Sequence, residues 1–141
     1  MRRRWPRRPA DGWQARGREE GSATLELTVL APVVLLLLFG VVQGALWLHA
    51  RNVALGAAQQ GLRAARAAGV TAPAVRAREQ ALAFVERAGG DQVLHDLDVE
   101  PASNPTEVTV VVRGRALSVL PGIPGPPVTQ VAVGPRERFT P

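Results

Sequence analysis

The stretch GSATLELTVLAPVVLLLLFGVVQGALWL, from Gly21 to Leu48, decides the fold because it is the only segment whose length and apolarity match a lipid bilayer. Its twenty residues from Val29 to Leu48 carry no charge. At a rise of about 1.5 Å per residue, such a segment makes a helix of about 30 Å, the thickness of a hydrocarbon core. The sequence therefore predicts a transmembrane helix over residues 22–48.

A strongly basic leader, residues 1–21, precedes this helix. Its first twenty residues, MRRRWPRRPADGWQARGREE, contain seven arginines and no helical or strand period. We interpret them as disordered in water and attracted to anionic lipid. Only three arginines occur in the twenty residues after the helix. The positive-inside rule therefore predicts a single-pass protein of the cytoplasmic (inner) membrane, with a cytoplasmic N-terminus and an extracytoplasmic C-terminal domain.

The composition excludes several classes of site. The chain has 141 residues, no Cys and no Lys, and its two histidines, His49 and His95, lie far apart in sequence. Without Cys the chain cannot form a disulfide or a zinc-thiolate site, and without Lys it cannot form a P-loop. Its two separated histidines predict no histidine cluster. The net charge of +5 comes largely from the leader, so we expect no nucleic-acid partner. We also expect no enzyme activity, cofactor or metal.

The helical pattern continues past Leu48. Residues 49–69 contain no Pro and are rich in Ala, and Leu48, Leu55 and Leu62 are spaced seven apart along one apolar stripe. We expect an outward helical extension that stops at Gly69. Small residues in the extension permit close packing, against another helix or against the protein's own domain. They are Ala50, Ala54, Ala57, Ala58 and Gly61.

A small extracytoplasmic α+β domain is predicted for residues 70–141. Pro73 fits the first turn of a second helix, with Thr71 as its cap, and this helix ends at Gly89-Gly90. Its apolar face is predicted to include Val75, Leu82 and Val85.

Three later segments, residues 93–100, 107–115 and 128–133, alternate like strands. A turn at 103–105 separates the first two, and the Pro-rich loop 121–127 precedes the third. The predicted fold class is α+β: a long N-terminal transmembrane helix that continues outward, a second short helix, and an antiparallel β-sheet of about three strands. The acidic residues near His95 fit the solvated side of a strand better than a calcium loop.

Three positions in the apolar helix carry functional hypotheses. Glu26 is a carboxylate close to the bilayer, where a charged group needs either the headgroup zone or a cationic partner. Gly40 and Gly44 form a G-x-x-x-G pair, which lets a second helix approach closely and would give a homo- or hetero-oligomer through the transmembrane helix.

The region from Arg16 to Ala68 resembles the TadE-like pseudopilins, minor pilin-like proteins of tight-adherence, or Flp type IVb, pilus systems. The shared features are a basic leader, Gly21, a few small or apolar residues, Glu26 and a long apolar helix. Leu27 stands where the major Flp pilins have Tyr. The external domain is also far larger than theirs, which favours a minor component.

This resemblance implies a maturation step and a pairing. A prepilin peptidase would cut after Gly21 and make Ser22 the first mature residue. The Glu26 carboxylate would then pair with the new α-amino group of an adjacent subunit, which offsets the desolvation of both charges.

The resulting hypothesis is a non-catalytic pseudopilin-like membrane protein that acts in assembly or priming of a tight-adherence/Flp-type pilus or a related secretion apparatus. Its expected partners are the lipid bilayer, a prepilin peptidase, other pilin-like subunits and pilus assembly membrane proteins. One alternative is a single-pass membrane-tethered interaction or sensor module with a small extracytoplasmic binding domain. A secreted domain released from a signal peptide is another, although the apolar part of a signal peptide is only about 7–15 residues long.

Overall fold

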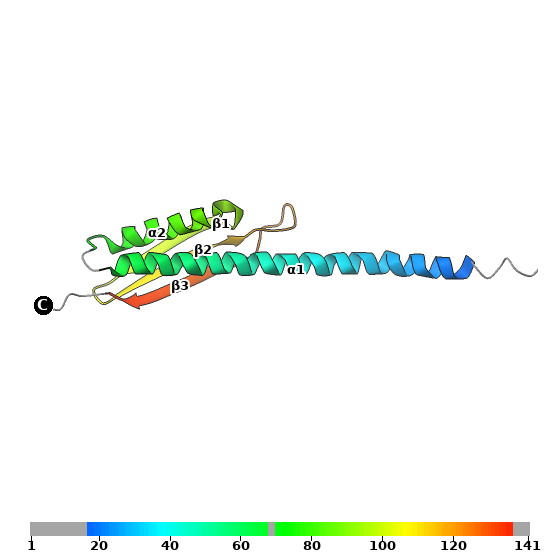
Figure 1. The fold of residues 1–141 in the computed structure, drawn as a ribbon, viewed down its shortest axis with the longest axis horizontal. Helices are drawn as coiled ribbons and strands as arrows, with labels where there is room; N and C mark the ends of the chain where they lie inside the picture. Colours follow the sequence, from blue (N-terminus) through cyan, green and yellow to red (C-terminus); the bar gives the residue numbers. More distant parts are fainter. Residues whose placement is uncertain (1–16, 68–69, 137–141) are drawn as a thin grey trace, which may run out of the picture. The chain divides into compact units, whose positions relative to one another are not determined.

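The computed structural model describes residues 17–67 and 70–136, with side chains described from Glu26 onward. The predicted α+β fold class is confirmed (Figure 1). The described residues fall into two compact units, which are divided between Leu38 and Phe39. The elements are α1 (Gly17–Arg66), α2 (Pro73–Arg87), the 3-10 helix η1 (Gly90–Gln92), β1 (Leu94–Ser103), β2 (Glu107–Ala116) and β3 (Pro127–Pro135).

In the first unit, the described residues are all part of α1. Because α1 begins at Gly17, the prediction of a disordered leader is wrong for residues 17–20. The rest of that leader, residues 1–16, lies outside the described residues. Pro32 is accommodated inside the helix, where its missing N–H removes one backbone hydrogen bond.

In the second unit, the three strands form an antiparallel meander in the order β1-β2-β3. The register of β1 against β2 shifts between His95 and Asp98, where Asp96 adopts a left-handed φ of 51°. This β-bulge interrupts the alternation predicted for the first strand. Gly114 lies beside it, and a Cβ at this position would be 2.6 Å from Cγ of Leu94. Glycine is therefore required where the two strands approach.

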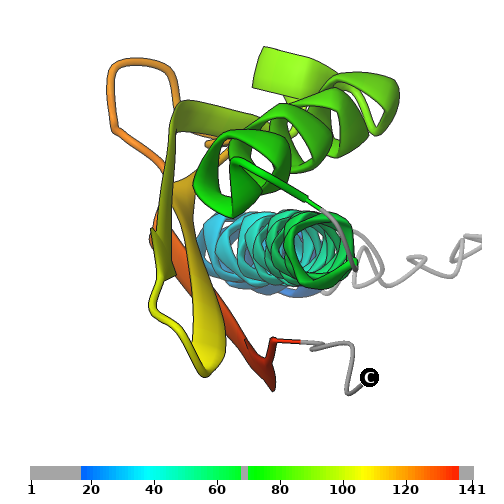
Figure 2. The ribbon, with the colours of Figure 1, turned by 90° about the vertical axis from the view of Figure 1, so that its left-hand side faces the viewer.

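The core of this unit lies between the C-terminal part of α1, α2 and one face of the sheet (Figure 2). The predicted inward face of β2, Val108, Val110 and Val112, is fully buried. The helical extension contributes mainly its small residues. Its buried members are Ala50, Val53, Ala54, Ala57, Ala58, Gly61, Leu62 and Ala65. The extension thus packs on the protein's own domain, which was one of the two alternatives.

The predicted leucine stripe is only partly correct. Leu62 is buried, but Leu48 is 51% exposed and Leu55 is only partly buried. Close approach favours small side chains here: a Cβ at Gly61 would be 2.7 Å from the backbone oxygen of Ala77 in α2. α1 ends at Arg66, and the predicted stop, Gly69, lies outside the described residues.

The second helix differs from its prediction in two details. Its N-cap residue is Ala72 without a side-chain hydrogen bond, so Thr71 does not cap it. Val75 is 56% exposed, whereas Val85 is buried as predicted, together with Ala77 and Ala81. The apolar face is therefore turned so that small residues meet α1. Pro73 occupies the first turn as predicted.

The turn between β1 and β2 depends on Asn104. Its Oδ1 accepts hydrogen bonds from the N–H of Glu107 at 2.7 Å, the N–H of Thr106 at 3.0 Å and Oγ1 of Thr106 at 3.1 Å. Such side-chain acceptors fix a turn by replacing backbone acceptors.

We expect Asn104→Ala to lower the free energy of unfolding by about 1 kcal/mol, because water can replace some of these bonds in an exposed turn. Chemical denaturation of the full chain in detergent micelles measures this change. Ser103→Ala, at the neighbouring exposed position, is the control and should alter stability by less than about 0.5 kcal/mol. Equal stability of the two variants would contradict the role given to Asn104.

Candidate functional site

The first candidate feature is the exposed apolar surface of α1. The large apolar side chains between positions 27 and 42 are 38% to 71% exposed. Within the described residues, the segment Glu26–Arg66 is the one helix long and apolar enough to cross a membrane. Exposing so many apolar side chains to water is unfavourable, at about 25 cal/mol per Å². The helix therefore indicates a single-pass membrane protein.

The predicted processing and pairing residues lie near the start of this helix. Gly21 and Ser22 both belong to α1, and their side-chain surroundings lie outside what the structure describes. Glu26 is exposed, and it has no ion-pair partner among the residues whose side chains are described. Among the described side chains, the structure therefore brings no cation to Glu26.

The surface above the predicted packing pair, Gly40 and Gly44, is not covered by other described residues. A Cβ added at Gly40 or at Gly44 would meet no atom within 4 Å. This differs from Gly56, where a Cβ would be 2.7 Å from the Phe84 ring, and from Gly61. The glycines of α1 whose surroundings are described thus form two groups. The protein's own domain packs against Gly56 and Gly61, whereas Gly40 and Gly44 leave room for a second helix.

One contact of α1 was missed by the sequence analysis. The side chain of Gln43 donates from Nε2 to the backbone oxygen of Leu117 at 2.9 Å, and its Oε1 accepts from the N–H of Val119 at 3.0 Å. One turn later, Nε1 of Trp47 donates to the backbone oxygen of Pro127 at 3.2 Å. The only signal in the sequence was that Gln43 is the most polar residue of an apolar run.

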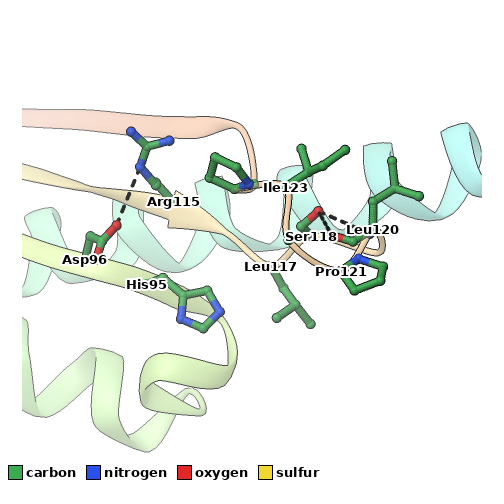
Figure 3. A pocket seen from close by; sticks show the side chains of 11 residues that line it. His95, Asp96, Arg115, Leu117, Ser118, Leu120, Pro121 and Ile123 are labelled. Carbon is green, nitrogen blue, oxygen red and sulfur yellow. Dashed lines mark hydrogen bonds and ion pairs between the residues drawn. The ribbon is translucent and has the colours of Figure 1, made fainter.

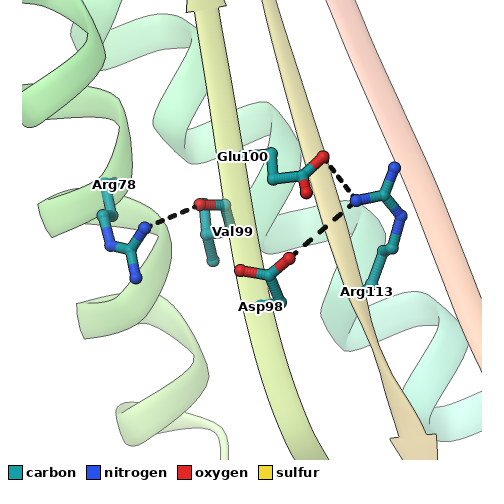
Figure 4. A network of polar contacts seen from close by, with 5 residues as sticks. All are labelled: Arg78, Asp98, Val99, Glu100 and Arg113. Atoms are coloured by element: carbon teal, nitrogen blue, oxygen red, sulfur yellow. Dashed lines mark hydrogen bonds and ion pairs between the residues drawn. The ribbon is translucent and has the colours of Figure 1, made fainter.

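Three of the four acidic residues near His95, namely Asp96, Asp98 and Glu100, belong to β1, as predicted, and they pair with arginines of β2. The fourth, Asp91, lies in η1 instead. Arg113 contacts the carboxylates of Glu100 and Asp98, the latter at 3.9 Å (Figure 4). Arg115 is 3.5 Å from Asp96. All these side chains are about half exposed or more. Exposed pairs of this kind add little stability, and the described residues contain no cluster that could hold a metal.

The same network continues toward α2. Arg78 donates from its guanidinium to the backbone oxygen of Val99 at 3.1 Å (Figure 4). This bond joins α2 to β1 and supports the packing of the helix beside the sheet. Its role is therefore structural.

An open depression of about 410 Å³ lies beside the start of β1 and the end of β2. It is lined by His95, the Asp96–Arg115 ion pair and residues of the loop that follows β2 (Figure 3). The lining includes Leu117, Leu120 and Ile123, which are apolar and partly exposed. No nucleophile with an adjacent base is present among these residues, so the depression shows no catalytic constellation.

The predicted site residues share one stretch of α1, and comparison with known families covers the same stretch. Residues 21–63 match the family model for TadE-like proteins. The resemblance predicted from the sequence is thereby confirmed. This TadE-like segment contains Gly21, Ser22, Glu26, Gly40 and Gly44. Comparisons with curated proteins and with solved structures gave no match.

The TadE-like match suggests involvement in the assembly of tight-adherence (Flp) pili. The segment covers about a third of the chain and ends within α1. It includes Gln43 and Trp47, but the residues whose backbone they bind lie outside it, as does the sheet.

Proposed function

We propose that this chain is a pseudopilin-like subunit that acts in the assembly or priming of a tight-adherence/Flp-type pilus or a related secretion apparatus. The observation that carries the proposal is the α1 surface over residues 27–42, which no described part of the chain covers and which lies inside a segment that matches TadE-like proteins. In the bilayer, lipid covers this surface. In an assembly, helices of other pilin-like subunits take the place of the lipid.

Lateral packing has a site on this surface. Gly40 and Gly44 lie one turn apart with open space above both, so a neighbouring helix can approach the α1 backbone closely. The domain of the second unit is built from the other end of the same helix, where small residues are already used for the sheet and α2. The proposal therefore assigns assembly to the part of α1 up to Gly44 and folding to the part from Ala50 onward.

The proposed maturation step is cleavage after Gly21 by a prepilin peptidase of the cytoplasmic membrane, with residues 1–21 on the cytoplasmic side. Removing the leader takes away seven arginines that hold the N-terminus at an anionic membrane surface. It also creates a cationic amine at Ser22, which Glu26 of an adjacent subunit can bind. Both changes favour movement of the helix from lipid into an assembly.

Cleavage is tested by the mass of the chain extracted from membranes of cells that contain the pilus system. We expect a mature chain that begins at Ser22, because the cut follows Gly21. We expect Gly21→Val to accumulate as the full-length precursor, since a branched side chain hinders access to the bond. Gly17→Val changes the same residue type four positions earlier and should be processed normally. An intact Met1 in the unmodified chain, or another N-terminus, would refute this step.

A further inference from the structure

Residues 117–126, between β2 and β3, form a loop that exposes apolar side chains. We call these residues the apolar loop. It contains no charged residue, and the chain is uncharged from position 116 to position 135. Leu117, Leu120 and Ile123 are 38%, 45% and 56% exposed. Packing against the described part of the chain therefore does not explain why this loop is apolar.

Hydrogen bonds hold the apolar loop against α1 inside the run expected to lie in the bilayer. Gln43 binds the backbone of the loop at Leu117 and Val119. It lies five residues before the end of the charge-free run at Leu48, or about 7.5 Å along the helix. The backbone that binds Gln43 must lie at the same depth as Gln43 itself.

Trp47 indicates how deep Gln43 and the apolar loop lie relative to the bilayer. Its indole N–H binds the oxygen of Pro127, just after the loop, and the guanidinium of Arg51 lies 5.9 Å from the centroid of its ring. Tryptophan is enriched at the membrane–water interface, and a nearby arginine extends its charged end toward the headgroups. The helix therefore passes through the interfacial layer at the turns that hold the loop.

We propose that the apolar loop is a second membrane contact, which lies in the interfacial layer of the leaflet next to the sheet and inserts Leu120 and Ile123 among the lipids. Figure 3 shows both side chains on the loop beside α1. The bilayer boundary then lies near Gln43, about one turn before Trp47. The loop sets how deeply α1 is inserted, because Gln43 cannot move further into the bilayer without taking the loop with it.

The backbone of the loop is suited to such a position. Three of its ten residues are proline and have no N–H group to satisfy. The N–H of Val119 binds Gln43, that of Leu120 binds the Ser118 hydroxyl at 3.2 Å, and that of Ile123 binds the oxygen of Leu120 at 3.3 Å. Irregular backbone is excluded from the hydrocarbon core when it faces lipid. The interfacial layer, where headgroups and water satisfy the remaining groups, is therefore the depth that fits.

The test uses the full-length chain in phosphatidylcholine vesicles, with nitroxide labels on single cysteines. The natural chain has no Cys, so each label is unique. Ile123→Cys and Leu120→Cys report on the loop. Val75→Cys is the matched control, because Val75 is as exposed as Ile123, at 56%, but lies in the first turn of α2. Collision rates with oxygen, which dissolves in lipid, and with a nickel chelate, which stays in water, report the surroundings of each label.

We expect the nickel chelate to reach both loop labels several-fold less often than the label at position 75, and oxygen to reach them more often. This protection should not change with the protein-to-lipid ratio. Loop labels as accessible to nickel as the control would overturn the proposal. Protection that increases with the protein-to-lipid ratio would also overturn it and assign the loop to a second copy of the chain. The outcome depends on insertion of α1 and not on cleavage or pilus assembly, so the two proposals fail separately.

Discussion

Replacing Gly61 by leucine is expected to separate α2 from α1 and to lower the free energy of unfolding of the Phe39–Pro141 unit by about 3 kcal/mol. A Cβ at Gly61 would lie 2.7 Å from the backbone oxygen of Ala77 and 3.4 Å from Cβ of Ala81. The backbone of α2 cannot rotate away as a flexible side chain could. The whole helix must move, and with it the buried Ala77, Ala81 and Val85.

Gly44→Leu is the matched control for this experiment. It introduces the same side chain into the same helix, but nothing lies within 4 Å of the new Cβ. Both variants gain about 1 kcal/mol of intrinsic helix propensity, so the difference between them isolates the contact with α2. Denaturant unfolding of the full chain in detergent micelles measures both. If Gly61→Leu is as stable as Gly44→Leu, the packing of α2 on α1 is not as described.

The strands could be predicted from the sequence because their pattern is local. Alternation over residues 107–115 identified the buried face of β2, and Val108, Val110 and Val112 are fully buried.

β1 was predicted less well, since the bulge near Asp96 breaks the alternation, and β1 continues to Ser103. Its position depends on Gly114 of the facing strand, which a pattern within one segment cannot contain.

The faces of the helices were harder to predict because hydrophobicity favours the wrong residues. The leucine spacing predicted a stripe through Leu48, which is exposed, whereas Ala50 and Ala54, predicted only as small residues that permit close packing, are fully buried. A helix that is close to both a sheet and a second helix selects small side chains at the contacts. Sequence periodicity measures which side is apolar, but it does not measure how near the neighbour comes.

The residues of the candidate site also differ in how far the sequence could predict them. The contact of Gln43 with the apolar loop joins residues 74 and 76 positions apart, through backbone groups of an irregular segment. No periodicity could have predicted it. The roles of Gly40, Gly44 and Glu26 depend on partners outside the chain, so they stay predictions that only experiments on the assembly can test.

Replacing Glu26 by glutamine should reduce assembly at least tenfold while leaving insertion and cleavage unchanged. The substitution removes the charge with almost no change in volume. Within the chain, Glu26 is exposed and has no described ion-pair partner, so the monomer loses nothing. In the assembly, the amine of Ser22 in the adjacent subunit would be left desolvated without its carboxylate. Breaking one side of a buried ion pair costs about 3–5 kcal/mol, which exceeds the 1.4 kcal/mol of a tenfold effect.

Two further variants separate this pairing from a general effect of charge. Glu107→Gln makes the same chemical change at an exposed position of β2 and should leave assembly unchanged. Glu26→Asp keeps the charge on a shorter side chain and should restore part of the output, because an amine at a chain end can move toward the carboxylate. The readouts are the yield of pili and the amount of chain cross-linked to other pilin-like subunits, each normalised to the chain present in the membrane. Normal assembly of the Glu26→Gln variant would exclude the pairing and return Glu26 to the headgroup zone, where a carboxylate needs no partner.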